Sequence, residues 1–396
     1  MSDEPVPPHG GRLRPLLVAD PAERRERLRA ASSLPRLSLT TREASDLIML
    51  AMGAFSPLDG FMRHADYVGV RDDMHLANGV LWPMPVTLAA DRATAGSLDA
   101  GARVALADSA TGEILGVMTI EDKFSYDAAL EARRVFGTDD ARHPGVAKLY
   151  SQREVYLGGP VEALSEGAYP ERFPDFARPT ETREIFRRRG WRTIAAFQTR
   201  NPIHRSHEYL TKIALEVCDG LFIHPIVGEL KEGDIPAEVR MRCYHALLEN
   251  YYPRDRVVLK VYPMEMRYAG PREAVLHAII RQNFGCTHLI VGRDHAGVGS
   301  YYGPFEAQEI FDRIPSGELL IRPLKLDWTF WCHRCETMAS PRTCPHGDDD
   351  HLMISGTRLR QMLSRGERPP TTFTRPEVAE ILIDYYRRAQ GEGPTK

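Results

Sequence analysis

The sequence predicts an α/β multidomain protein with a β-rich first domain, a central parallel-sheet domain and a small C-terminal domain. Three observations support this prediction. Short runs rich in β-forming residues fill the stretch from Val80 to Thr119. After Thr182, strand-like runs alternate with helical runs. From about Trp328, a cysteine cluster is followed by two helical stretches. A chain of 396 residues has room for two or three domains, expected at residues 1–175, 176–327 and 328–396.

The composition is that of a folded globular protein, with 43% hydrophobic and 27% charged residues. The formal net charge is −3, whereas nucleic-acid binders usually carry a basic excess, so we expect no nucleic-acid partner. No apolar run reaches the roughly 18 residues of a membrane span. The N-terminus lacks the apolar segment of a signal peptide. These features predict a cytoplasmic protein without a membrane partner.

The first domain is expected to open with an irregular arm of about 35 residues, because this stretch is rich in Pro and Arg and lacks periodicity. A helix should begin at the Thr40/Thr41 cap and end at Gly53. The β-rich runs then lie at 80–89, 102–108 and 113–120. The proline-dense stretch 169–182 is the expected domain boundary.

The central domain should contain repeated strand–helix units. Strand-like runs at 193–197, 220–228, 257–263 and 287–292 are followed by helical runs at 205–218, 237–252, 272–284 and 305–314. Such alternation predicts a mostly parallel sheet, and ligands bind such sheets at the carboxyl ends of the strands. Two further helices are expected around 358–367 and 375–389.

The segment QTRNPIHRSHE directly follows the strand at 193–197 and enters a helix. Pro202 suits a helix start, and His204 and His207 at spacing i, i+3 share one face near that start. A helix start binds anions through its free N–H groups. The guanidinium of Arg200 can fork onto an oxyanion, and the segment also holds the neutral donors Gln198, Thr199 and Asn201. We therefore interpret this turn as an anion site.

A second polar loop, GRDHAGVG at 292–299, directly follows the strand at 287–292. Its glycines allow backbone to approach a ligand, and Arg293 and His295 can meet phosphate or ribose. Without the first motif, an ordinary structural turn would be the better interpretation.

The cysteines indicate one metal cluster and no disulfide framework. Cys332, Cys335 and Cys344 follow a C-x2-C-x8-C pattern, which suits a tetrahedral, structural Zn²⁺. The fourth ligand is His346 or His351, and both are within reach. The other three, Cys218, Cys243 and Cys286, stand apart and are expected to be buried thiols, as in a reducing cytoplasm.

Together these motifs resemble the ATP sulfurylase family. Its QxRNPxHxxH and GRDHAG signatures are both met, and the likeness extends over PHGG (8–11), AFSPLDGFM (54–62), LKEGDIPAEVR (230–240), MRYAGPREA (266–274) and ISGTRLR (354–360). The resemblance implies an N-terminal PUA-like β domain, a nucleotidyltransferase-type (Rossmann-like) domain and a small C-terminal domain. The P-loop pattern GxxxxGK[ST] of a fused kinase does not occur in the sequence.

The activity implied by the resemblance is adenylyl transfer from ATP to sulfate, which yields adenylyl sulfate (APS) and pyrophosphate. A sulfate oxygen would attack the α-phosphorus in line, with ATP entering as its Mg²⁺ complex. The resemblance implies a sulfate site at Gln198, Arg200 and the Ala296 N–H, and catalytic roles for Thr199, Arg200 and Asn201. It implies an ATP site made of Gln198, Thr199, Arg200, Asn201, His204, His207, Gly292, Arg293, Asp294 and His295. A homodimer is the implied assembly.

Some points stay open at the level of sequence. The motifs serve sulfate activation and its reversal equally, so the physiological direction is not determined. Another nucleotidyltransferase, acting on a pantetheine phosphate or a nicotinamide nucleotide, shares the HxxH turn but would not be expected to combine the Gln-Thr-Arg-Asn run with GRDHAG. A zinc-ribbon nucleic-acid module would need a basic face, which the net charge does not favour.

Overall fold

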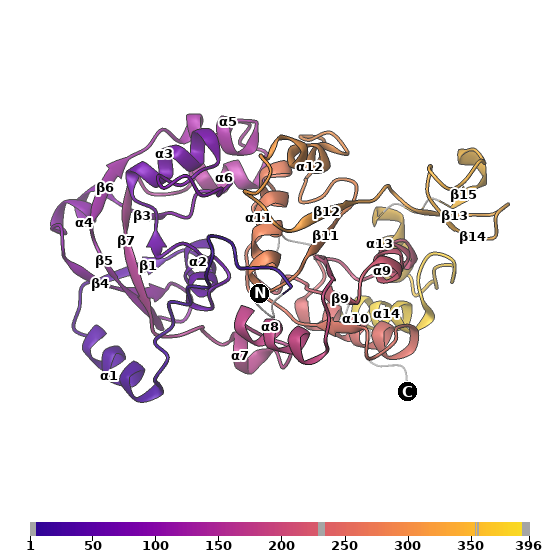
Figure 1. The fold of residues 1–396 in the computed structure, drawn as a ribbon, viewed down its shortest axis with the longest axis horizontal. Coiled ribbons are helices and arrows are strands. Elements are labelled where there is room, and N and C mark those ends of the chain that lie inside the picture. The colour runs from indigo at the N-terminus through magenta and orange to yellow at the C-terminus, as the bar shows by residue number, and fades with distance from the viewer. Residues whose placement is uncertain (1–4, 229–233, 353, 355, 390–396) are drawn as a thin grey trace.

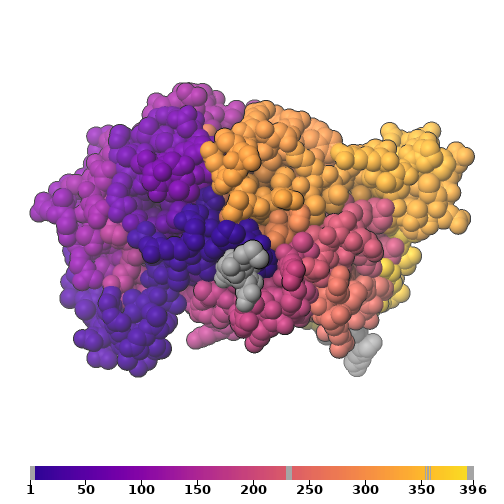
Figure 2. Space-filling view, in the orientation of Figure 1, coloured from indigo at the N-terminus to yellow at the C-terminus, as the bar shows by residue number. Residues whose placement is uncertain are grey.

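A computed structural model describes residues 5–228, 234–352, 354 and 356–389. Of the stretches singled out above, 230–233 and Ser355 lie outside the described residues. Figure 1 shows the β-rich first part at one end, the parallel-sheet part in the middle and a small antiparallel sheet, β13 to β15, at the other end. These are the three parts that the sequence predicts, while their boundaries at 175 and 327 stay predictions. Figure 2 shows the indigo start of the chain packed against the central part.

The first part is built on a seven-stranded sheet with β7 at its centre. Its order is β1-β4-β5-β7-β2, and β3 and β6 also pair with β7. The strands are β1 (Arg36–Leu39), β2 (Gly60–Phe61), β3 (Leu88–Ala90), β4 (Arg103–Asp108), β5 (Ile114–Thr119), β6 (Asp122–Ser125) and β7 (Val155–Ala163). The helices of this part are α2 (Thr41–Ala51), α3 (His64–Asp73), α4 (Arg92–Ser97), α5 (Ala128–Phe136) and α6 (Pro144–Tyr150).

Helix α2 begins where the sequence predicts, because Thr40 and Glu43 form a capping box. The side chains of both residues satisfy backbone N–H groups at the helix start, and the chain turns away at Gly53 with φ +81°. The expectation of an irregular arm was wrong in part, because the arm contains helix α1 (Pro21–Ala31). Asp20 caps this helix, but only Ala31 is buried, so no hydrophobic periodicity marked it.

The run at 80–89 is mostly not a strand, contrary to the expectation from its composition. Pro83 and Pro85 interrupt it, and proline cannot donate to a ladder. Trp82 is fully buried in the hydrophobic core of this part, and its indole N–H donates to the Met84 carbonyl at 2.8 Å. Only the last residues join β3, which pairs antiparallel with β7. The runs at 102–108 and 113–120 form β4 and β5 as predicted.

The central part contains a five-stranded parallel sheet in the order β10-β9-β8-β11-β12. Its strands are β8 (Ile194–Phe197), β9 (Gly220–Ile223), β10 (Val257–Leu259), β11 (His288–Val291) and β12 (Arg322–Lys325). From the central pair β8 and β11, the chain adds β9 and β10 on the β8 side and β12 on the β11 side. The boundary between β8 and β11 is therefore a topological switch point, and ligands bind such sheets there, at the carboxyl ends of the strands.

Helices cover both faces of this sheet (Figure 1). They are α7 (Tyr169–Arg172), α8 (Pro179–Arg188), α9 (Arg205–Val217), α10 (Ala237–Tyr251), α11 (Pro271–Asn283) and α12 (Glu306–Glu309), which continues as a 3-10 turn at Ile310–Arg313. Helix α11 lies between the sheet and the first part, and every residue from Glu273 to Asn283 is buried. One hydrophobic core therefore continues from the first part through α11 to the sheet.

The C-terminal part joins a three-stranded antiparallel sheet to two helices that pack on the central part. The strands are β13 (Phe330–Cys332), β14 (Thr337–Ala339) and β15 (His351–Leu352), and the helices are α13 (Gly356–Ser364) and α14 (Pro376–Ala389). Helix α14 packs on α10 and shares a second core with α10 and β9. Within the described ranges, no helix combines the length and apolar character needed to cross a membrane.

Candidate active site

The two polar motifs meet at the switch point of the parallel sheet. The turn beginning at Gln198 leaves the carboxyl end of β8, and the loop beginning at Gly292 leaves the carboxyl end of β11. A cavity of about 300 Å³ lies between them. Its lining includes all of the predicted sulfate residues and most of the predicted ATP residues: Gln198, Thr199, Arg200, Asn201, His207, Gly292, Arg293, Asp294, His295 and Ala296.

The first turn is fixed by bonds among its own residues. The Thr199 hydroxyl donates to the Asn201 carbonyl at 2.8 Å and accepts from the Asn201 N–H at 3.0 Å. Tyr244 of α10 also donates to that carbonyl at 2.8 Å. Thr199 therefore shapes the turn, while the exposed Asn201 faces the cavities.

Helix α9 begins at Arg205, with His204 as its N-cap. Pro202 therefore lies before the helix and not in its first turn, so it shapes the approach to the helix. The His204 N–H donates to His207 Nδ1 at 3.5 Å, and the ring centroids are 6.4 Å apart. The two imidazoles thus lie together at the helix start, as their spacing predicts.

Both imidazoles are neutral at pH 7. Burial lowers the pKa of His207 to about 4, and burial together with the nearby His207 lowers the pKa of His204 to about 3. His207 accepts at Nδ1, so its proton is on Nε2, where it can be donated. His207 is therefore a neutral hydrogen-bond donor at Nε2. His204 is also neutral, and its Nδ1 lies 3.0 Å from the Thr374 hydroxyl.

Arg200 supplies the buried positive charge of the site. Its Nη1 is buried and has no hydrogen-bond partner among the described residues. The guanidinium carbon lies 4.8 Å from the ring centroid of Tyr268, which is a cation–π contact. An unpaired buried guanidinium N–H is costly, so this arrangement favours an anionic ligand.

Gln198 is held by buried neighbours. Its Oε1 accepts from the Tyr262 hydroxyl at 2.9 Å, and its Nε2 lies 3.1 Å from His277 Nε2. The same Nε2 lies 3.8 Å from Met266 Sδ. The amide orientation is therefore defined from behind the cavity.

The second loop turns tightly to face the first. Asp294 and Ala296 have φ values of +54° and +57°, which is unusual for residues other than glycine. The Asp294 N–H donates to the Pro304 carbonyl at 2.9 Å, and the Gly297 N–H donates to the Asp294 carbonyl at 3.1 Å. Arg293 pairs with Asp294 at 3.1 Å and lies over the Trp328 ring.

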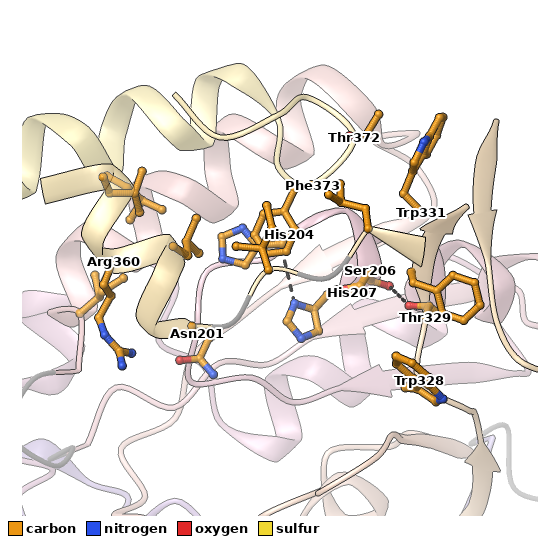
Figure 3. Close-up of a pocket in the computed structure, with 18 of the residues that line it drawn as sticks. Asn201, His204, Ser206, His207, Trp328, Thr329, Trp331, Arg360, Thr372 and Phe373 are labelled. Carbon is orange, nitrogen blue, oxygen red and sulfur yellow. Dashed lines mark hydrogen bonds between the residues drawn. The ribbon is translucent and has the colours of Figure 1, made fainter. Parts of the chain in front are cut away.

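Two further cavities adjoin the first, and Arg200 lines all three. The larger, of about 430 Å³, opens between the α9 start, the C-terminal helices and the segment leading to β13 (Figure 3). Figure 3 shows Phe373 beside His204, with Trp328 and Thr329 facing His207. The smaller, of about 240 Å³, lies behind His295.

The structure thus brings the predicted sulfate and nucleotide residues together around connected cavities. Sequence reasoning missed Tyr262, Tyr268, His277 and Trp328, which hold or face these residues. Tyr268 lies in the MRYAGPREA stretch, which the resemblance singled out but left without a role. For His277 and Tyr262, no sequence signal existed, because each lies in an apolar run that predicts a core element.

The cysteine cluster forms a compact set of possible metal ligands. Facing atoms of Cys332, Cys335, Cys344 and His346 all lie within 4.8 Å of one another. The His346 Nδ1 atom is 3.4, 3.2 and 3.6 Å from the three Sγ atoms in that order. A tetrahedral Zn²⁺ with normal bond lengths places sulfur and nitrogen about 3.6 Å apart. These residues therefore fit Zn²⁺.

His351 lies beside the cluster, outside this closest set. Its Nε2 is 3.8 Å from Cys344 Sγ, and its ring stacks on Phe330 with a centroid distance of 3.6 Å. The isolated Cys218, Cys243 and Cys286 are buried free thiols, as expected.

Comparison with known proteins gives a consistent result. A family model described as ATP-sulfurylase matches residues 176–385, and a PUA-like domain model matches residues 6–166. Proteins named sulfate adenylyltransferase are similar over nearly the whole chain. That of Desulforamulus reducens is 55% identical over 96% of this chain and 98% of its own. That of Syntrophobacter fumaroxidans is 56% identical over 96% of this chain and 94% of its own.

Among solved structures, a protein from Thiobacillus denitrificans described as a hexameric APS kinase aligns with a TM-score of 0.73. It is 27% identical, and the alignment covers 95% of this chain and 68% of that chain. The likeness therefore extends through all three parts of the fold.

Proposed function

The chain belongs to the ATP-sulfurylase family, and we propose that the cleft between β8 and β11 is its adenylyl-transfer site. The enzyme joins sulfate to the AMP group of ATP, giving adenylyl sulfate and pyrophosphate. In the proposed mechanism a sulfate oxygen attacks the α-phosphorus while the bond to the β-phosphate oxygen breaks. Sulfate is already a dianion, so a base has no proton to remove.

The proposed catalytic work is to bring two anions together and to stabilise the charge on the leaving pyrophosphate. We assign sulfate to Gln198, Arg200 and the backbone N–H of Ala296. The observation that carries this assignment is the buried Nη1 of Arg200, which has no hydrogen-bond partner in the described part of the chain and lies at a point shared by all three cavities. Thr199, Arg200 and Asn201 form the proposed catalytic turn, in which Thr199 acts by holding Asn201 in place.

The nucleotide is assigned to the two histidines and the second loop. His204 and His207 offer neutral imidazoles at the start of α9, where a phosphate chain would also meet the helix dipole. Gly292, Arg293, Asp294 and His295 line the opposite side. ATP enters as its Mg²⁺ complex, so Mg²⁺ belongs to the substrate.

The key test is Arg200→Ala. Loss of this guanidinium should lower sulfate-dependent pyrophosphate release by more than ~100-fold, the scale of losing a key electrostatic donor. The matched control is Arg133→Ala, an exposed arginine on α5 paired with Asp139, which should keep full activity. Near-normal turnover by a folded Arg200→Ala protein would contradict the assignment. Pyrophosphate release that does not depend on sulfate would instead favour another nucleotidyltransferase.

We further propose a structural Zn²⁺ held by Cys332, Cys335, Cys344 and His346, with His351 packed beside it at 3.8 Å from Cys344 Sγ. Four protein ligands leave no open position, so the ion would brace the β13–β15 sheet and take no part in the reaction.

Elemental analysis tests the zinc site. We expect about one zinc ion per chain, retained in His351→Asn and lost or weakened in His346→Asn. Purified protein without zinc, in which all six cysteines react freely with a thiol reagent, would rule the site out. Equal zinc loss in both variants would show that His351 is also a ligand.

For the assembly and the compartment, we propose a homodimer in the cytoplasm. The resemblance to kinase-free relatives supports the dimer. The buried free thiols of Cys218, Cys243 and Cys286 suit a reducing compartment. Analytical ultracentrifugation tests the dimer, and a hexamer or a monomer would contradict it.

A further inference from the structure

Four polar side chains, Tyr262, Gln198, His277 and His295, form a hydrogen-bonded row at the sulfate end of the site. We propose that His277 in this row is a positioning residue for sulfate. It holds the Gln198 amide in the orientation that offers N–H to sulfate, and it links this amide to the His295 ring of the second loop. This inference rests on the proposed assignment of Gln198 to sulfate. His277 itself is fully buried on α11, so it acts through its neighbours.

The row is continuous in hydrogen-bond distances. The Tyr262 hydroxyl donates to Gln198 Oε1 at 2.9 Å, and Gln198 Nε2 lies 3.1 Å from His277 Nε2. On its other side, His277 Nδ1 lies 3.1 Å from His295 Nε2. His277 thus joins the first polar turn to the second loop through one imidazole.

The hydrogen bond from the Tyr262 hydroxyl to Gln198 fixes the donor and the acceptor of every other hydrogen bond in the row. Because Tyr262 donates to Gln198 Oε1, the amide N–H₂ group faces His277, whose Nε2 must accept. The His277 proton then lies on Nδ1 and is donated to His295 Nε2. His295 in turn carries its proton on Nδ1, away from His277.

This polarity suits an anion. The second N–H of the Gln198 amide meets only Met266 Sδ, a weak acceptor at 3.8 Å that an oxyanion can replace, and the Nδ1–H of His295 is not used by the row. Reversing the row would turn an amide oxygen and a bare imidazole nitrogen towards the ligand, both of which repel an oxyanion. The ring that sets the polarity is itself held, since the Arg281 guanidinium lies 4.3 Å from the Tyr262 ring centroid.

The charged groups around His277 do not compete for its bonds. Glu273 Oε1 is 3.6 Å from His277 Nε2, beyond hydrogen-bond distance. Both Glu273 oxygens already accept backbone N–H groups, from Arg267 at 2.9 Å and from Ala269 at 3.0 Å. Gln198 is therefore the partner of His277 Nε2.

The test compares KM for sulfate and KM for ATP in His277→Leu and His277→Gln. Leucine fills the space without hydrogen bonds, and we expect KM for sulfate to rise about tenfold or more with KM for ATP changed less than about threefold. Glutamine can accept from Gln198 and donate to His295, so it should restore KM for sulfate to within about threefold. If the leucine variant does not fold, His277→Asn, which is too short to bridge both neighbours, takes its place.

Two outcomes would overturn the inference: an unchanged KM for sulfate in the leucine variant, or an equal loss for both substrates that glutamine does not restore. The matched control is His9→Asn. His9 is a buried histidine bonded to the Leu81 carbonyl at 2.6 Å in the first part of the chain, and its loss should leave both KM values unchanged.

Gln198→Leu separates this inference from the function on which it rests. If Gln198→Leu weakens sulfate binding and His277→Leu does not, only the role of His277 fails. If Gln198→Leu has no effect on sulfate, the assignment of the sulfate site fails. If both assignments hold, the double variant should lose little more than Gln198→Leu alone, because the two residues act as a unit.

Discussion

At the scale of single residues, Arg200 shows how a positive charge is kept available for an anion. A carboxylate partner would neutralise the guanidinium, whereas the Tyr268 ring attracts it and leaves its Nη1 without a hydrogen-bond partner among the residues that the structure describes. Tyr268 holds an unusual φ of +60°, and His143 Nε2 lies 3.0 Å from its carbonyl oxygen. The contact with His143 therefore helps to keep Tyr268 in a strained backbone conformation that places its ring under Arg200.

Replacing Tyr268 should weaken sulfate-dependent turnover. Tyr268→Leu removes the cation–π contact, which is worth about 1–2 kcal/mol at a desolvated site, so kcat/KM should fall about 5- to 30-fold. Tyr268→Phe keeps the ring and should stay within about twofold of the parent. Steady-state kinetics with varied sulfate measure both, and equal losses in the two variants would place the effect in the hydroxyl group.

The buried and half-buried imidazoles of the site make stability depend on pH. Burial lowers the pKa of His204 and His295 to about 3 and that of His207 and His277 to about 4. The unfolded chain binds protons at these histidines near its ordinary pKa of about 6.5, while the folded protein does not. Their contribution is therefore full above pH 6.5 and is lost as the pH falls towards 4.

We expect the free energy of unfolding in urea to decrease from pH 7 to pH 5, by up to about 1.4 kcal/mol per pH unit for each of the four groups. Glu131 acts in the opposite sense, because burial raises its pKa to about 7. NMR of ¹⁵N-labelled histidine should show these four rings neutral at pH 6. Titration of the four near pH 6.5 would contradict this account.

The sequence allowed the donor residues to be predicted but not their supports. Gln198 and Arg200 directly follow a recognisable strand, and His207 lies in the first turn of the next helix, so their place at a strand end could be inferred. Met266 contacts Gln198 from 68 residues away, and such a contact depends on how the segment before α11 packs against the first polar turn. Residue spacing along the chain carries no information about it.

At the scale of elements, β8 to β11 of the parallel sheet were predictable because each is short, apolar and followed by a helix. The fifth strand, β12, was not predicted, because its residues Arg-Pro-Leu-Lys are not an apolar run and β13 follows it. Two helices also show where such patterns fail. Helix α1 buries only Ala31, so it has no apolar face to detect. Helix α11 is buried on all sides, so its charged residues could not be assigned to a solvent face, and Glu273, His277 and Arg281 proved to be internal.

The hairpin sheet β13–β15 should depend on its proposed zinc ion. Its hydrophobic cluster is small, with Phe330, Cys332 and Ala339 as the buried members, so the metal would supply much of its stability. Because Trp328 and Thr329 lead into this sheet and line the cavities, removing zinc with a chelator should lower activity as well as local order. Hydrogen exchange should increase in residues 330–352 and stay unchanged in β8 and β11. Full activity in zinc-free protein would show that the cavity lining does not need the hairpin.

At the scale of the whole molecule, the first part of the chain acts as a support for the active site. Residues 263–270 carry Met266 and Tyr268 against the first polar turn, and they are fastened to α2. The Ser45 hydroxyl donates to the Pro263 carbonyl at 2.9 Å, and Glu265 pairs with Arg42 at 3.1 Å. The Gly270 N–H donates to the Ala296 carbonyl at 3.1 Å, so the same segment also holds the second loop.

The buried ion pair of Asp46 and Arg267 is the strongest of these contacts between α2 and residues 263–270. Arg267 donates to both Asp46 oxygens, at 2.6 and 2.7 Å, and both side chains are almost completely buried.

Asp46→Ala leaves the Arg267 charge buried without a partner, which should destabilise the protein by about 3–5 kcal/mol. The double variant Asp46→Leu/Arg267→Met removes both charges and should recover most of that stability. Urea unfolding measures both variants, and kinetics then separate stability from positioning. If the pair serves only stability, the double variant regains full turnover. We expect instead that it stays less active, because Tyr268 next in the chain is no longer held under Arg200.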